Sequence, residues 1–149
     1  MSRTVLDGFS PAAFVAAREK AGLSVLNLAR TVGVGFATIY AWERGDRRPQ
    51  LPVLRKVAAV LNVPLDSLII VPPDERKLSY YRNIRGITQA ECAARAKMPT
   101  STLAAIETGQ YTMISNETAA KLAAALDIAV DEVVAAFERA RHREPPTPE

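Results

Sequence analysis

The segment GLSVLNLARTVGVGFATIYAWERG, residues 22–45, carries the strongest structural signal in this chain. Ser24 stands directly before apolar residues that recur at three- and four-residue spacing, and serine is a favoured helix N-cap. This pattern predicts a short helix over residues 25–32 and a second helix over residues 36–44. Gly33 lies between them, where a tight turn with a positive φ is easy for glycine.

Helical spacing continues on both sides of this segment. Ser10 and Pro11 open a helix before it, and Pro49 and Pro52 open another after it. A fifth helix is predicted around residues 65–70. Aromatic residues make up only 6% of the chain and strand-like alternation is scarce, so we expect an all-α fold.

The pattern then returns further along the chain as an internal repeat. At an offset of 64 residues, Arg18, Gly22, Ala29, Thr38, Glu43 and Gly45 align with Arg82, Gly86, Ala93, Thr102, Glu107 and Gly109. At an offset of 65 residues, Lys56, Ala58, Ala59, Leu61 and Asp66 align with Lys121, Ala123, Ala124, Leu126 and Asp131. The second copy therefore has one extra residue after its third helix.

The repeat predicts two tandem five-helix domains. The first covers residues 10–71 with its motif at 25–44, and the second covers residues 75–141 with its motif at 89–108. Two prolines make residues 72–74 a stiff joint, and Asp74 is expected to cap the next helix. The later helices are expected to end at Arg85, to run over residues 89–96 after the cap Thr88, near 100–108, from Asn116, and over 130–141. Residues 142–149 hold three prolines and no apolar face, so we expect a disordered tail.

A short helix, a tight turn and a second helix form the unit that presents one helix to the major groove of DNA. Both copies resemble the Cro/phage-repressor (XRE-type) helix-turn-helix family, with its Gly, Leu-Ser/Thr, Leu-Ala, Thr-Ile and Glu-x-Gly steps. The second copy reads GITQAECAARAKMPTSTLAAIETG. The resemblance covers residues 14–69 and 78–137, and it implies lambda-repressor-like domains in which Glu43 and Glu107 pair within the fold.

Each position of the motif also has a mechanical reason. Ala29 and Ala93 are expected where two helices cross closely, and Trp42 is expected in the core. Lys97 replaces the turn glycine in the second copy, so we expect that turn to have a different shape.

The resemblance also implies which residues contact DNA. In the first copy, it places Val25 at a phosphate position and Gly35, Phe36, Ala37 and Tyr40 at base-reading positions. In the second copy, it places Gln89 at the phosphate position and Thr100, Ser101 and Ala104 at reading positions, and Lys97 adds a cation nearby. Aromatic rings at these positions touch thymine methyl groups or sugars but read hydrogen-bond patterns poorly.

Charge is divided unequally between the copies. Residues 1–71 hold nine Lys and Arg against five Asp and Glu, whereas residues 72–149 hold ten against eleven. Arg44, Arg47 and Arg48 directly follow the first reading helix, where they are placed to grip the DNA backbone. We expect both copies to dock, with the first supplying more affinity and the second more hydrogen-bonded readout. In a competing interpretation, only the first copy binds DNA, and the second has become a dimerisation module or a scaffold without a ligand.

Other classes of function find little support in the sequence. Cys92 aligns with the core residue Leu28, and His142 is the only histidine, so we expect no disulfide, metal site or cofactor. We find no catalytic constellation and no apolar run of the roughly 18 residues that span a membrane. We therefore expect a cytoplasmic protein of a bacterium or phage.

Two hypotheses for function follow. The first is a sequence-specific regulator of double-stranded DNA, a repressor that binds an operator through two recognition helices. The second is a protein-interaction module, an antitoxin or adaptor, that keeps the fold but binds a protein through Phe36, Ala37, Tyr40 and Ala41. The chain either spans two half-sites alone or forms a homodimer, and the C-terminal helix is the candidate dimer surface, with Val130, Val133, Val134 and Phe137.

Overall fold

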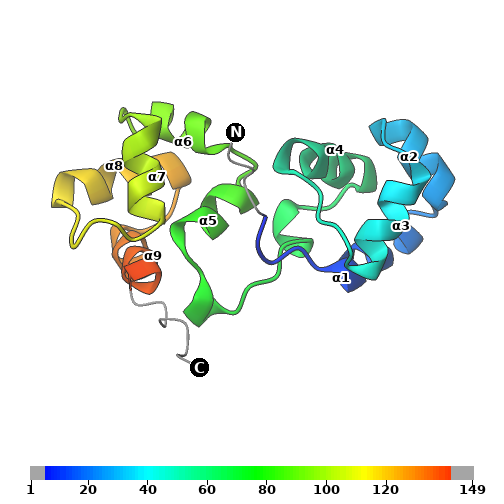
Figure 1. Ribbon diagram of the computed structural model, residues 1–149, viewed down its shortest axis with the longest axis horizontal. Coiled ribbons are helices and arrows are strands. Elements are labelled where there is room, and N and C mark those ends of the chain that lie inside the picture. The colour runs from blue at the N-terminus through cyan, green and yellow to red at the C-terminus, as the bar shows by residue number, and fades with distance from the viewer. Residues whose placement is uncertain (1–5, 142–149) are drawn as a thin grey trace, which may run out of the picture. The chain divides into compact units, whose positions relative to one another are not determined.

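The computed structural model describes residues 6–141, and the tail predicted over residues 142–149 lies outside them. The chain divides into two compact units between Ile70 and Val71, and Figure 1 shows the helices of each. Within residues 6–141 the fold is helical and contains no strand. This confirms the all-α class and the two helix-turn-helix domains expected from the repeat.

Unit 1 holds four α-helices and one short 3₁₀ helix in its described part. These are α1 (Pro11–Lys20), α2 (Val25–Val32), α3 (Phe36–Arg44), α4 (Leu51–Leu61) and η1 (Leu65–Ser67). Its core is centred on rings: Phe14 lies between Phe9 and Trp42, with ring centroids 5.9 Å apart in both pairs. Trp42 is buried, as expected for a core residue.

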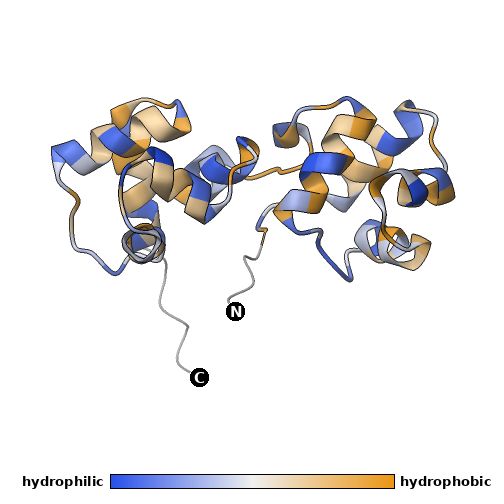
Figure 2. Ribbon diagram, turned by 90° about the horizontal axis from the view of Figure 1, so that it is seen from above, coloured by the Kyte–Doolittle hydropathy of each residue, from blue (hydrophilic) through white to orange (hydrophobic). Residues whose placement is uncertain are grey.

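Over residues 71–141, unit 2 holds one 3₁₀ helix and five α-helices. These are η2 (Pro73–Glu75), α5 (Leu78–Ile84), α6 (Gln89–Arg95), α7 (Thr100–Glu107), α8 (Asn116–Leu126) and α9 (Val130–Arg141). Its core is mainly aliphatic, with Leu103, Ile106 and Leu122, and it also contains the Phe137 ring. In both units the helices carry apolar residues beside hydrophilic ones, as Figure 2 shows, which is the pattern of helices that bury one face.

The fifth helix predicted around residues 65–70 is wrong as a full helix, because only the turn Leu65–Ser67 is helical. The backbone after that turn forms hydrogen bonds with the segment that precedes α1 instead. The Ser10 amide donates to the Leu68 carbonyl at 2.9 Å, and the Ile70 amide donates to the Gly8 carbonyl at 2.7 Å. A long-range pairing of extended backbone therefore replaces the last turns of the predicted helix.

The predicted cap at Asp74 is also wrong. Asp74 lies inside the 3₁₀ turn of η2, and α5 starts later, with Lys77 at its N-cap and no side-chain hydrogen bond there.

Two of the four residues expected on a dimer surface of α9 are not accessible to a partner. Val133 and Phe137 are buried in the core of unit 2, whereas Val130 and Val134 are exposed.

Candidate nucleic-acid interface

The helix pair of unit 1 is formed by local capping. The Ser24 hydroxyl accepts a hydrogen bond from the Asn27 amide at 3.1 Å, which satisfies a free donor at the start of α2. Gly33 ends α2 with φ +80°, in the left-handed region that favours glycine. Ala29 is buried, as expected for a small residue at the crossing of two packed helices. The caps and the small residue together fix α3 against α2.

One side of α3 is buried and the other is exposed. Ile39 and Trp42 are buried in the core of unit 1. Phe36, Ala37 and Tyr40 lie at the remaining helical positions and are exposed, together with Gly35 and Arg44. The predicted reading residues of the first copy therefore lie on one accessible face, and the Phe36 and Tyr40 rings contact each other edge to face at 6.3 Å.

Unit 2 repeats this arrangement with different side chains. Thr88 and Glu91 form a capping box at the start of α6, with hydrogen bonds of 3.1 and 3.2 Å. Leu103 and Ile106 bury one side of α7. Thr100 and Ser101 are exposed at the start of α7, and Ala104 is half-buried. At the offset of 64 residues, Thr100 takes the position of Phe36 and Ala104 takes the position of Tyr40, so no aromatic ring stands at either position of α7.

The turn between α6 and α7 keeps the shape of the first copy, contrary to the expectation of a different turn. Lys97 has a φ of +56°, and Gly33 at the equivalent position has a φ of +80°. The left-handed conformation is unfavourable for a residue with a Cβ atom. The geometry of the helix pair has therefore been retained at an energetic cost, and the Lys97 side chain is exposed beside α7.

A matched ion pair links the first helix of each unit to its reading helix. The Arg18 Nε group donates to Glu43 at 2.8 Å, and the Arg82 Nε group donates to Glu107 at 2.9 Å. The pair in unit 2 is bidentate, with a second bond of 3.0 Å, and its Arg82 side chain is only 2% exposed. Glu43 and Glu107 therefore hold α3 and α7 in place, as the resemblance implied.

The two side chains expected at the phosphate positions face their own units. Val25 is only 9% exposed and packs into unit 1. The Gln89 amide donates to Glu107 at 3.1 Å, so it extends the ion pair of unit 2. The Val25 side chain therefore packs inward, whereas Gln89 is half-buried and its side-chain amide keeps a second hydrogen beyond the one donated to Glu107.

Arg44 at the end of α3 and the two arginines that follow the helix are exposed, and two of these three side chains pair with acids. Arg44 lies 2.9 Å from Asp46, and Arg48 lies 3.2 Å from Asp7. Arg47 has no ion pair with any other residue that the structure describes. Neither acidic partner was predicted from the sequence. Asp46 lies only two residues from Arg44, whereas Asp7 is distant in sequence and is brought close by the fold. Exposed pairs of this kind are weak, so they do not prevent an exchange of partner for phosphate.

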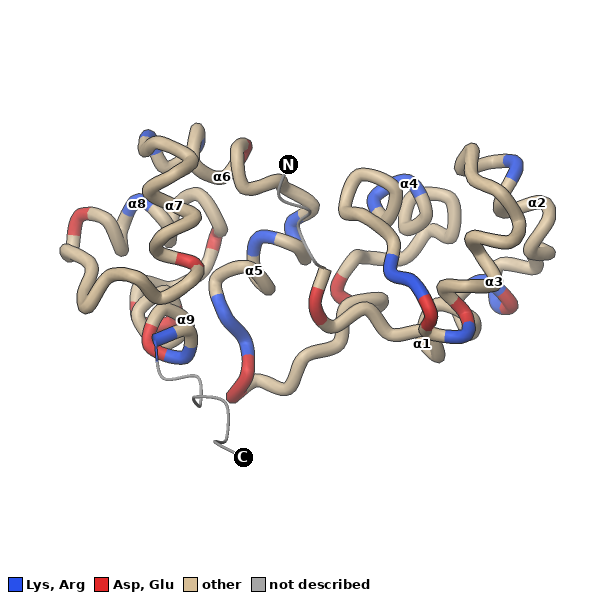
Figure 3. Tube along the Cα trace, in the orientation of Figure 1, with Lys and Arg blue, Asp and Glu red and all other residues tan. Residues whose placement is uncertain are grey.

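Figure 3 shows how unevenly charge is distributed on the two reading helices. Arg44 ends α3, and Arg47 and Arg48 follow it, whereas α7 carries no cation and ends in Glu107. The nearest cations that precede α7 in sequence are Arg95 and Lys97, which are exposed. A polyanion is therefore attracted mainly by unit 1.

The remaining chemistry of the described residues offers no reactive centre. Cys92 is buried, and burial raises the pKa of its thiol to about 11, with the nearby Glu107 carboxylate adding to the rise. Residues 6–141 contain no group of His, Cys, Asp and Glu side chains placed to hold a metal ion. Among the helices described, none is long and apolar enough to cross a membrane.

Comparison with known protein families agrees with this geometry. The model of a helix-turn-helix family matches the chain twice, over residues 15–68 and 78–133. No curated protein and no solved structure gave a match. The family is a DNA-binding family and not a family of enzymes. With one match in each unit, this chain belongs to the XRE-type helix-turn-helix family of DNA-binding transcription regulators, as a tandem repeat.

Proposed function

We propose that this protein is a sequence-specific repressor that binds an operator in double-stranded DNA through α3 and α7. The observation that carries the proposal is the exposed face of each reading helix, which its matched arginine–glutamate pair holds in place. The major groove is about 12 Å wide and admits a single helix with its side chains. Occupancy of a promoter by such a protein blocks transcription without any further chemistry.

The two units contribute differently in this proposal. Arg44, Arg47 and Arg48 supply phosphate contacts next to α3, and phosphate contacts provide most of the sequence-independent affinity. Thr100 and Ser101 supply hydroxyl groups that hydrogen-bond to base edges from α7. Phe36 and Tyr40 add apolar contacts to thymine methyl groups or sugars. Unit 1 therefore provides affinity, and unit 2 refines the choice of sequence.

A salt titration tests the role of the arginines. We expect Arg47→Ala with Arg48→Ala to weaken binding to every duplex and to reduce the slope of log affinity against log salt by about 2, because each lost phosphate contact contributes about 0.9. The double variant Lys20→Ala with Lys56→Ala removes the same charge from exposed positions on α1 and α4. That control is expected to leave the slope nearly unchanged, and an equal loss in both variants would contradict the assignment.

Selection of bound sequences from a random duplex pool tests the reading residues. Thr100→Ala with Ser101→Ala is expected to relax the selected sequence at the bases under α7 by about tenfold, since one good base contact discriminates by about 1–3 kcal/mol. Total affinity for non-specific DNA should stay the same. An unchanged selected site would show that α7 does not read bases. A reporter gene with the selected site in its promoter then measures repression directly.

One observation favours a second candidate function, a protein-interaction module of the antitoxin or adaptor kind. Phe36 is 58% exposed and Tyr40 is 46% exposed, and adjacent exposed aromatic rings are typical of surfaces that bind a partner. The salt titration separates the two functions. Absence of binding to any duplex, even at low salt, would support the protein partner.

A further inference from the structure

Each unit has a groove beside its reading helix, and the two grooves are equivalent by the internal repeat. In unit 1 the groove is lined by Val34 and Thr38, by Arg47 and Arg48, and by the start of α4. In unit 2 it is lined by Met98 and Thr102, by the segment after α7, and by the start of α8. Val34 and Thr38 align with Met98 and Thr102 at the offset of 64 residues, and Arg48 aligns with Met113 at the offset of 65.

The lining of the groove is cationic in unit 1 and largely apolar in unit 2. Arg48 of unit 1 is replaced by Met113, and Pro49 and Gln50 are replaced by Ile114 and Ser115. The unit 1 groove is therefore suited to a phosphate, whereas the arginines are absent from the lining of the unit 2 groove. Thioether and aliphatic groups replace them, and these avoid water rather than bind anions.

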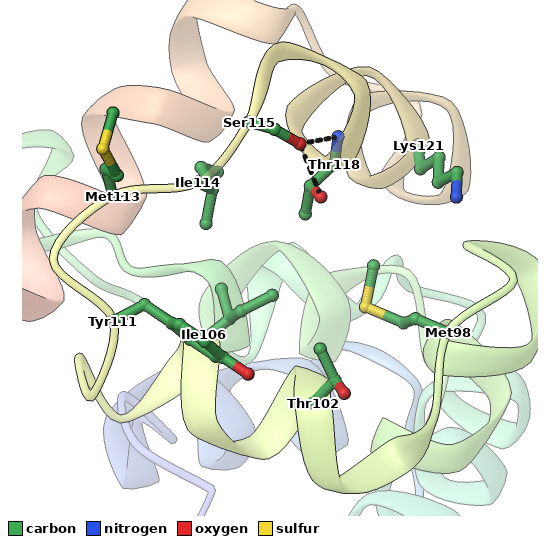
Figure 4. Close-up of a pocket in the computed structure, with 9 residues that line it drawn as sticks. All are labelled: Met98, Thr102, Ile106, Tyr111, Met113, Ile114, Ser115, Thr118 and Lys121. Atoms are coloured by element: carbon green, nitrogen blue, oxygen red, sulfur yellow. Dashed lines mark hydrogen bonds between the residues drawn. The ribbon is translucent and has the colours of Figure 1, made fainter.

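The unit 2 groove has the form of a small ligand site. Its volume is about 280 Å³, close to the lower end of the range of roughly 300–1,000 Å³ found for ligand pockets. Figure 4 shows Ile106 and Thr102 of α7 facing Ile114 and Thr118 across the gap. Tyr111 and Met113 stand at the rim and are 43% and 74% exposed. Covering exposed apolar side chains around a groove with a ligand lowers the free energy of the system, because it removes apolar surface from water.

The polar groups of the groove define the other end of that ligand. The Ser115 hydroxyl donates to the Thr118 hydroxyl oxygen at 3.0 Å, which leaves the Thr118 hydroxyl hydrogen available. Lys121 is the single charged residue in the lining. Its ammonium group lies 3.5 Å from a Glu117 carboxylate that is 80% exposed, and exposed pairs of this kind are weak. A negative group on a ligand is therefore favoured at this end.

We propose that the groove between α7 and the start of α8 binds a small amphipathic carboxylic acid. Its apolar body lies between Met98, Ile106 and Met113, and its carboxylate lies near Thr118 and Lys121. The site contacts α7 directly through Thr102 and Ile106. The apolar part of the site is a feature of the second copy, because Met113 and Ile114 line it where Arg48 and Pro49 line the groove of unit 1.

Octanoate, with 1-octanol as the uncharged comparison, tests the proposal by NMR of the full chain. Met98 and Met113 both line the groove, so methyl-labelled methionine places two reporters in it. We expect octanoate to shift the Met98 and Met113 methyl signals along a saturable curve. Met113→Leu assigns the signals. The titration contains no DNA, so its outcome is separate from that of the proposed function.

The charged end is tested with a matched pair of variants. Lys121→Gln is expected to weaken octanoate about threefold, as for loss of an exposed ion pair, and to leave 1-octanol unchanged. Lys56→Gln is the control at the aligned position of α4, and it is expected to change neither ligand. Methyl signals that do not move, shifts that fail to saturate, or an unaltered octanoate affinity in Lys121→Gln would overturn the proposal.

Discussion

Lys97 shows how a turn is kept after its glycine is lost. The backbone at Lys97 has the same left-handed conformation as Gly33, although its Cβ atom makes that conformation unfavourable by about 1–2 kcal/mol. The packing of α6 against α7 therefore holds the residue in place. Local preference alone predicted a different turn, and the tertiary contacts of the helix pair determined the outcome.

We expect Lys97→Gly to stabilise unit 2 by about 1 kcal/mol, because glycine adopts the positive φ without strain. The reverse substitution, Gly33→Lys, should destabilise unit 1 by a similar amount. Urea unfolding of the full chain measures both, since Trp42 fluorescence reports unit 1 and far-UV circular dichroism reports both units. A fluorescence transition that moves in Lys97→Gly, or no gain in unit 2, would contradict this explanation.

The resemblance implied the reading positions on α3 and α7, and helical spacing accounts for their exposure, because the core residues occupy the opposite face of each helix. Helical spacing does not give the orientations of Val25 and Gln89, because these depend on what lies opposite them. Val25 is apolar and packs inward, and Gln89 finds the buried Glu107 carboxylate. These side-chain orientations depend on contacts between residues far apart in sequence, and the periodicity of apolar residues does not predict such contacts.

At the level of elements, α9 is attached to unit 2 by a polar cluster that joins three segments. The Tyr81 hydroxyl of α5 donates to Glu132 at 2.5 Å, and Arg139 donates to Glu132 and to the Arg76 carbonyl, both at 2.8 Å. The hydrogen bond from Tyr81, the hydrogen bond from Arg139 and the positive charge of Arg139 lower the pKa of Glu132. Burial and the bond to Glu132 raise the pKa of Tyr81.

This cluster makes the stability of unit 2 depend on pH in the acid range. The carboxyl group of an unfolded glutamate titrates near pH 4.3, and the folded pKa of Glu132 is lower, so its stabilisation is complete above pH 4.3. It is lost as the pH falls through the folded pKa. We expect Glu132→Gln to cost about 1–2 kcal/mol at pH 7 and to reduce the loss of stability between about pH 5 and pH 3.

Urea unfolding followed by circular dichroism at several pH values measures this effect. Glu117→Gln is the control, because Glu117 also lies in unit 2, on α8, and its bond with Lys121 is an exposed pair one helical turn apart. It should cost less than about 0.5 kcal/mol. An equal pH dependence in wild type and Glu132→Gln would contradict the assignment to this carboxylate.

Helix boundaries were predicted well wherever a cap made them local. Ser24, Thr88 and Gly33 each mark an end that the structure confirms. The predictions were wrong for the helix around residues 65–70 and for the cap at Asp74, because the backbone forms short 3₁₀ turns at both places. Residues 68–70 pair with the segment before α1, and the partner of a backbone group across sixty residues is not encoded in local spacing.

At the level of the whole molecule, two reading helices in one chain predict a distinctive binding stoichiometry. Half-sites on one face of DNA repeat about 34 Å apart, and the first contact makes the second intramolecular. We expect one chain to bind a duplex with two half-sites at least about a hundredfold more tightly than a duplex with one. Fluorescence anisotropy gives the affinities, and sedimentation gives the number of chains per duplex.

Two chains per duplex would indicate a homodimer instead, and Val130 and Val134 are the exposed residues of α9 that such a dimer would use. The substitution Val134→Asp separates the cases. It is expected to leave one-to-one binding intact and to abolish two-to-one binding. Equal affinity for one and two half-sites would show that only one unit docks.

The burial of Cys92 allows the opening of unit 2 to be measured. Cys92 carries the only thiol in the sequence, it lies on α6 with its side chain buried, and its pKa is far above neutral. A thiol reagent in solution therefore modifies it only during the moments when unit 2 opens. The rate of Cys92 labelling therefore measures how often unit 2 opens and releases its reading helix.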